Sequence, residues 1–201
     1  KFESVIVLAN SFGGIAAVDT MNAYKEQFPK SNTRFVLALL SAPTGPENLQ
    51  FLSWLGAQFH AHVEVPQDAV YGETFVGEWS QGKRWLNDKQ LEQDVKNNAV
   101  QTPATLLSSQ TKRLLKGMSK IDERLDVTLV YVGDKNDDVV DIDEAIQDVP
   151  TKTGRPLTGI FYMSYPDLML QAHAGLWWLP YIQSNREPIA EVFTLAQNDM
   201  G

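Results

Sequence analysis

A short apolar segment followed by a glycine turn and a helical pattern limits most strongly what this chain can fold into. Residues Ser4–Ala9 are apolar and rich in β-branched side chains, which predicts a buried strand. Gly13 and Gly14 follow, and apolar residues then recur at a helical spacing to about Gln27. A second apolar run, Arg34–Leu40, comes next. A strand, a tight turn, a helix and a strand form a βαβ unit, so we expect an α/β fold with a parallel sheet and helices on its faces.

The same pattern predicts two more strands later in the chain, Val127–Val132 and Gly159–Ser164. An acidic helix capped by Asp141 and ending near Gln147 lies between them, and helices near Leu176–Gln183 and Pro188–Gln197 end the chain. These strands extend the same sheet.

Between these core segments the strand patterns fade and helical patterns take over. We expect helices at Asp88–Asn97 and at Pro103–Lys120, the second with Thr102 as its N-cap. The chain is therefore predicted to contain three parts. Residues 1–44 carry the first turn of the α/β core, residues 45–125 form a mostly helical insertion above the sheet, and residues 126–201 complete the core.

Composition excludes several classes of function. The 201 residues include 17 Lys and Arg against 25 Asp and Glu, for a net charge of −8, which disfavours nucleic acids and anionic lipid surfaces as partners. The absence of cysteine excludes disulfides and thiolate metal sites. No apolar run is long enough to span a membrane. We expect a soluble protein, with a slight preference for the cytoplasm.

The turn after the first strand reads Ala9-Asn10-Ser11-Phe12-Gly13-Gly14. Small residues two positions before and after a serine allow a strand and a helix to meet at a sharp turn, as in the Gly-x-Ser-x-Gly nucleophile motif. Ser11 Oγ would project from the carboxyl edge of the sheet, where the Phe12 N–H is placed to stabilise an oxyanion. The alternatives are a serine that only caps the helix, and a glycine turn that holds a phosphate.

Three histidines are candidates for the base that such a serine needs. His173 follows the fourth strand in a loop of small residues, and an exposed loop histidine is the alternative reading. His60 and His62 alternate as in a strand, so both would face one side. They could share a metal with Glu64, but nothing nearby completes a ligand set, so we favour surface or groove histidines and predict no metal site.

The third strand leads into an acidic loop, Gly133-Asp134-Lys135-Asn136-Asp137-Asp138. A carboxylate just beyond the carboxyl end of a strand is suited to orient the base. A calcium loop is rejected because Val139 and Ala145 stand where Gly and Glu are needed. A solvated loop that leads into an acidic helix is the remaining alternative.

Ser11, Asp137 and His173 occur in this order, each after a predicted strand of one sheet, and with them the sequence resembles the α/β-hydrolase superfamily. In that family the acid loop often reads Gly-x-x-Asp-x-Val-Val. This matches Asp137 with one inserted residue, so Asp138 stays an alternative acid. The helical insertion falls where the family places its substrate-covering cap.

The resemblance implies a serine hydrolase or acyltransferase that acts on an ester, thioester or small amide without a cofactor. Ser11 would attack the acyl carbon, His173 would act as base and then as acid, Asp137 would orient it, and Phe12 would donate its N–H to the oxyanion. The substrate would be a small acyl compound. The aromatic residues of the insertion, and those after His173, suit an apolar acyl group, although we favour core packing over direct contact with substrate as their explanation.

One departure from the family bears on partners. The nucleophile turn of the family follows its fifth strand, whereas here it lies at residue 11, so the resemblance implies the C-terminal half of the fold. The first strand would then be an unpaired edge, which natural proteins avoid. We expect a second polypeptide segment, N-terminal to Lys1, to complete the sheet. The alternative function is a non-catalytic, hydrolase-like binding or scaffolding module completed by another chain.

Overall fold

A computed structural model describes residues 3–62, 70–71, 102–163 and 186–198. The chain divides into two compact units, one of residues 1–55 with 114–201 and one of residues 56–113. The predicted helices at Asp88–Asn97 and Leu176–Gln183 lie outside the described residues.

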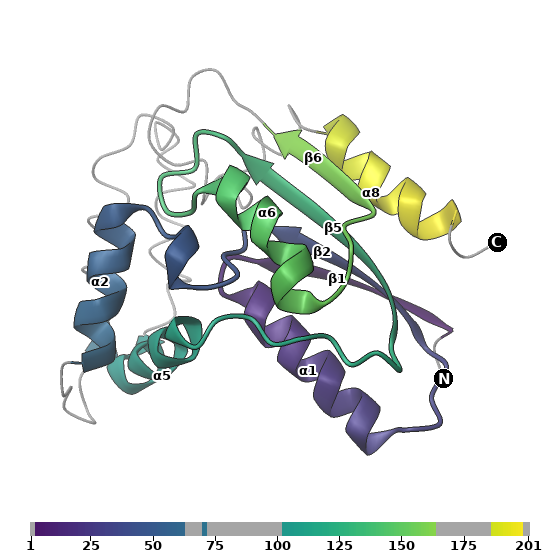
Figure 1. Ribbon diagram of the computed structural model, residues 1–201, viewed down its shortest axis with the longest axis horizontal. Helices are drawn as coiled ribbons and strands as arrows, with labels where there is room; N and C mark the ends of the chain where they lie inside the picture. Colours follow the sequence, from purple (N-terminus) through teal and green to yellow (C-terminus); the bar gives the residue numbers. More distant parts are fainter. Residues whose placement is uncertain (1–2, 63–69, 72–101, 164–185, 199–201) are drawn as a thin grey trace, which may run out of the picture. The chain divides into compact units, whose positions relative to one another are not determined.

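The first unit is built on four parallel strands in the order β1-β2-β5-β6 (Figure 1). Their ranges lie within two residues of those predicted, and they are Ser4–Asn10, Arg34–Leu40, Asp126–Asp134 and Gly159–Met163. Asn10 lies opposite Leu40, and Leu40 lies opposite Val132. The carboxyl ends of the strands therefore meet at one rim of the sheet.

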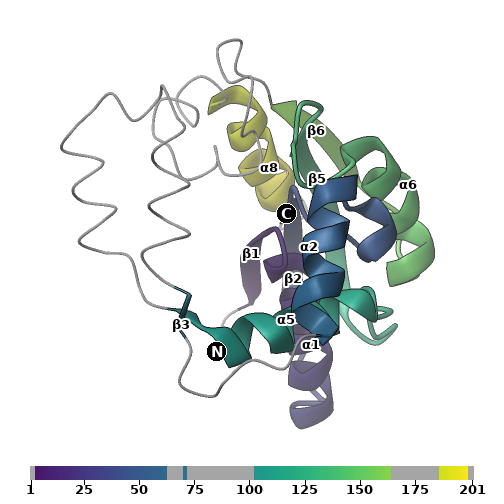
Figure 2. The same cartoon turned by 90° about the vertical axis from the view of Figure 1, so that its left-hand side faces the viewer.

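Helices cover both faces of this sheet, which explains why its central strands are apolar throughout. Helices α1 (Gly13–Gln27) and α6 (Ile142–Thr153) share one core cluster with alternate residues of β2 and β5, among them Leu37 and Leu129. The opposite face carries α8 (Arg186–Asn198), whose Val192 is buried (Figure 2). The predicted parallel α/β sheet flanked by helices is confirmed.

The remaining described elements are η1 (Pro46–Asn48), α2 (Phe51–His62), β3 (Val70–Tyr71), β4 (Thr102–Pro103) and α5 (Ala104–Leu115). Strands β3 and β4 form a short antiparallel pair. None of the helices within the described ranges combines the length and the apolar character needed to cross a bilayer.

Several helix ends differ from the prediction. Thr102 pairs with Tyr71 in a strand instead of capping a helix, and α5 ends at Leu115, two residues before the left-handed Gly117. Helix α6 begins as predicted, because the Asp141 side chain accepts a hydrogen bond from the Glu144 N–H. However, α6 continues six residues beyond Gln147, to Thr153.

Candidate active site

Ser11 occupies the turn between β1 and α1 in a strained backbone conformation. Its φ is 52°, in the left-handed region that side chains other than glycine rarely adopt. The Ser11 N–H donates to Leu40 O at 2.9 Å, and Asn10 Nδ2 donates to the same oxygen at 3.1 Å. The Ser11 carbonyl accepts a hydrogen bond from the Gly14 N–H at 3.0 Å. These bonds tie the turn to the end of β2 and hold the serine in its strained conformation.

The second glycine after Ser11, rather than the first, permits the close approach of helix and sheet. A Cβ on Gly14 would lie 2.7 Å from Ala42 Cβ, a distance at which the backbone or the neighbour must move. A Cβ on Gly13 would meet no atom of the described residues within 4 Å. Among the described residues, Gly14 is therefore the glycine of this turn that faces packed side chains.

The N-terminus of α1 begins directly after the serine. Phe12 is the N-cap residue, and the first turn of α1 contains no acidic side chain to neutralise the positive end of the helix dipole. The first N–H groups of a helix have no carbonyl acceptor within the helix, so they are suited to bind an anion. The Phe12 N–H stays a predicted oxyanion donor on this basis.

The acidic loop after β5 fixes one carboxylate inside the protein and leaves its neighbour in solvent. Asp137 is 5% exposed, and its Oδ1 accepts hydrogen bonds from the N–H groups of Val139 at 2.9 Å and Val140 at 2.8 Å. Asp138 is exposed. Asp134 is also buried and orders the same loop, since its Oδ1 accepts from the Asn136 N–H. This structural role of Asp134 was not predicted from the sequence.

The negative charge of Asp137 influences the pKa of Tyr131, a buried residue of β5. Burial, and secondarily the nearby negative charge of Asp137, raise the pKa of Tyr131 far above its ordinary value. The neutral Tyr131 hydroxyl donates to Ala42 O at 2.9 Å. This bond joins β5 to the segment after β2, which lies between the serine turn and the acidic loop.

The serine turn and the acidic loop leave the same rim of the sheet on opposite sides of β2. Strands β1 and β5 each pair with β2, so they stand two strand spacings, or about 10 Å, apart. That gap is suited to an imidazole ring between a hydroxyl and a carboxylate. Strand β6 also ends at this rim, since Met163 lies opposite Asp134. His173, the predicted base, lies outside the described residues.

The two remaining histidines do not lie in a strand as predicted. His60 and His62 belong to helix α2, which ends at His62. The apolar spacing of Phe51–Ala61 suits a helix, and this spacing outweighs the local alternation around the histidines. Glu64 lies outside the described residues, and the described part of the chain contains no cluster of three residues suited to a metal.

No family model matches the sequence, and no curated protein matches it in sequence. In fold, the chain is similar to a protein from Burkholderia cenocepacia assigned as an aryl esterase, with a TM-score of 0.51 and 12% identity over 96% of this chain and 64% of that one. It is equally similar to a lipase-esterase related protein from Clostridium acetobutylicum, with a TM-score of 0.51 and 11% identity over 97% of this chain and 66% of that one.

These likenesses establish the fold. The parallel sheet with its flanking helices is the fold of the α/β-hydrolase superfamily, as the resemblance in the sequence implied. The chain spans slightly less than two thirds of the length of the two solved structures.

Proposed function

We propose that this chain carries the catalytic residues of a serine hydrolase that acts on an ester or thioester with a small acyl group. The observation that carries the proposal is the left-handed φ of Ser11, held by hydrogen bonds at the turn from a parallel strand into a helix. A strained serine at this point of an α/β sheet presents its hydroxyl at the rim. The esterases among proteins of similar fold support the same class.

In the proposed reaction, Ser11 Oγ attacks the acyl carbon while His173 takes the hydroxyl proton. The Phe12 N–H donates to the oxyanion of the tetrahedral intermediate. Collapse of the intermediate breaks the bond to the leaving alcohol or thiol, which receives the proton from His173. Water then attacks the acyl-enzyme, with His173 as base again, and releases the acid and Ser11. Attack by another acceptor in place of water would make the same site an acyltransferase.

Asp137 is the proposed acid that orients His173 and stabilises the imidazolium. Its burial and its two backbone hydrogen bonds support this choice over Asp138, because an orienting carboxylate must be held in one position. An exposed side chain such as Asp138 is free to turn toward water.

The test is covalent labelling of the full-length polypeptide that carries these residues with a fluorophosphonate probe. We expect labelling at Ser11, its loss in Ser11→Ala, and a rate at least about 100-fold lower in His173→Ala, in line with the usual contribution of a general base. Ser41→Ala is the matched control, since Ser41 is a buried serine with a φ of 45° at the end of the neighbouring strand. Its labelling should equal that of the parent protein.

Folded full-length protein that takes no label, or that takes label equally in Ser11→Ala, would refute the proposal. The first result would favour the alternative function, a hydrolase-like module that binds or scaffolds without turnover.

A further inference from the structure

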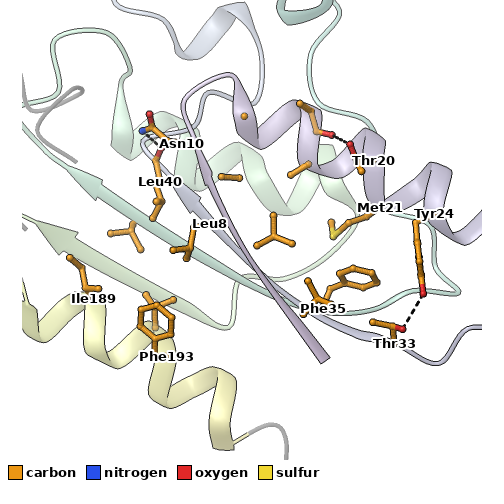
Figure 3. A pocket seen from close by; sticks show the side chains of 18 of the residues that line it. Leu8, Asn10, Thr20, Met21, Tyr24, Thr33, Phe35, Leu40, Ile189 and Phe193 are labelled. Carbon is orange, nitrogen blue, oxygen red and sulfur yellow. Dashed lines mark hydrogen bonds between the residues drawn. The ribbon is translucent and has the colours of Figure 1, made fainter. Parts of the chain in front are cut away.

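Residues 40–50, which we call the linking segment, join the end of β2 to the start of α2. The first residue of the segment is fixed to the serine turn. Leu40 O accepts hydrogen bonds from the Ser11 N–H at 2.9 Å and from Asn10 Nδ2 at 3.1 Å, and the second bond is visible in the close-up of the cavity beside β1 (Figure 3). The linking segment therefore begins at a point whose position is set together with that of Ser11.

The other end of the linking segment pairs with the residues that hold the Asp137 carboxylate. Leu49 lies opposite Val140 in an antiparallel bridge, and the neighbouring Gln50 N–H donates to Val139 O at 2.9 Å. The N–H groups of Val139 and Val140 are those that donate to Asp137 Oδ1. A displacement of this end of the segment would therefore move the donors that fix the carboxylate.

Asn48 fixes the linking segment between its two ends. It is fully buried, and its Oδ1 accepts hydrogen bonds from the N–H of Thr44, at 2.9 Å, and from the Thr44 hydroxyl. Its Nδ2 donates to Asp148 Oδ2 of α6 at 2.9 Å. The carbonyl of Asn48 accepts from the N–H of Asp141, the N-cap residue of α6, at 2.8 Å. One amide side chain thus closes the turn of the segment and holds it against α6.

The burial of these groups makes the position of the segment specific. Removal of the Asn48 side chain would leave the buried N–H and hydroxyl of Thr44 without their acceptor, which favours other positions of the segment. A second contact, the ion pair between Glu47 and Lys152, also joins the segment to α6. Both of its side chains are partly exposed, and ion pairs of this kind contribute little. Asn48 is therefore the stronger of the two attachments.

We propose that Asn48 is a positioning residue of this site, which fixes the acidic loop, and thereby the Asp137 carboxylate, relative to the Ser11 turn. The inference rests on the proposed function, because Asn48 acts on the reaction only through Asp137. A displacement of about 1 Å in a catalytic group can lower a rate on the order of 100-fold, so a residue that touches no reacting atom can still affect the rate strongly.

The test is a double-mutant cycle on the rate of fluorophosphonate labelling at Ser11 in the full-length polypeptide. Asn48→Ala should lower the rate at least about tenfold in the parent background. In the Asp137→Asn background the same substitution should lower it less than about twofold, because the group through which Asn48 acts is already altered. A general loosening of the fold would instead lower both rates by the same factor.

Two further variants complete the cycle. Asn22→Ala is the matched control, since Asn22 Nδ2 donates to Lys120 O and its Oδ1 accepts from the Asp122 N–H, in a similar bridge in the second half of α1. Its labelling rate should stay within about twofold of the parent rate. Asp148→Ala removes only the acceptor of Asn48 Nδ2, so it serves if Asn48→Ala does not fold. It should lower the rate at least about threefold, again in the parent background alone.

Amide hydrogen exchange gives a readout that needs no catalysis. In Asn48→Ala, exchange at the Val139 and Val140 amides should accelerate by a factor at least about ten times that seen at residues 129–132 of β5. In Asn22→Ala the two factors should be equal.

Equal falls of the labelling rate in the two backgrounds, no fall in the parent background, or equal exchange factors in Asn48→Ala would overturn the proposal. A loss of labelling in Asn22→Ala as large as that in Asn48→Ala would overturn it too. A parent protein that takes no label at Ser11 refutes the proposed function instead, and the exchange at Val139 and Val140 then decides whether Asn48 positions Asp137.

Discussion

Two serines at neighbouring strand ends are the non-glycine residues of the described chain with a left-handed backbone. Ser11 follows β1 with φ 52°, and Ser41 follows β2 with φ 45°. The N–H of each serine donates to a backbone carbonyl of the neighbouring strand. Ser11 donates to Leu40 O of β2, and Ser41 donates to Val132 O of β5. Each such conformation costs about 1–2 kcal/mol for an L-residue, so the rim of the sheet stores strain where the site is proposed.

Replacing Ser11 should separate this strain from the chemistry. Ser11→Gly and Ser11→Ala both remove the hydroxyl, but glycine adopts a positive φ without strain. We expect Ser11→Gly to unfold with a free energy about 1 kcal/mol higher than Ser11→Ala in urea denaturation, while neither variant takes the fluorophosphonate label. Equal stability of the two variants would show that the turn is not strained in the way the backbone angle indicates.

Asp137 should have a structural role that is separable from its proposed catalytic one. Asp137→Ala removes the acceptor of the Val139 and Val140 N–H bonds and should lower the free energy of unfolding by about 2 kcal/mol or more. Asp137→Asn keeps an oxygen acceptor, so it should recover most of the stability while the labelling rate falls on the order of 10³-fold or more.

Asp138→Ala serves as the control, because this side chain is exposed and should change the free energy of unfolding by no more than about 0.5 kcal/mol. A labelling rate that falls with Asp138→Ala and not with Asp137→Asn would transfer the role of the acid to Asp138.

At the scale of elements, the contact between α1 and the sheet depends on one of two adjacent glycines. Gly14→Ala places a methyl group 2.7 Å from Ala42 Cβ and 3.0 Å from Leu39 Cδ2, and should destabilise the protein by about 1–3 kcal/mol. Gly13→Ala enters open space in the first turn of a helix and should be neutral or stabilising by up to about 1 kcal/mol. Thermal or urea unfolding of the two variants measures the difference, and equal effects would contradict the packing described for this turn.

The elements that sequence patterns predicted best are those whose whole environment is apolar. Helix α1 and strand β2 have the predicted boundaries, because turn residues bound a continuous apolar or periodic run in each case. Helix α6 was predicted to end near Gln147, but it continues through Pro150 to Thr153. Val149 and Thr153 are fully buried there, and their packing offsets the cost of about 3 kcal/mol that a proline imposes inside a helix.

At the scale of the whole molecule, the effect of a charged side chain introduced on β1 depends on whether another strand covers β1. The quantity that reports this is the free energy of unfolding. If an additional strand covers β1, Leu8→Lys buries an ammonium group in the full-length polypeptide, and the free energy of unfolding should fall by about 2 kcal/mol or more. Ile160→Lys is the control, and it should change the free energy by no more than about 0.5 kcal/mol. Equal, small effects of the two lysines in urea unfolding would mean that β1 is a solvent-facing edge.

The amino-acid sequence by itself determined the parallel α/β core, because strand and helix periods, turn residues and the βαβ handedness are local properties of the chain. It also placed Ser11 and the acidic loop after strands of one sheet. Only the tertiary structure decided that Gly14 closes the turn, that Asp137 is buried while Asp138 is exposed, and that the two histidines of α2 lie on a helix. Those outcomes depend on which surfaces face each other after folding, and contacts between residues far apart in the chain leave no periodic trace in the sequence.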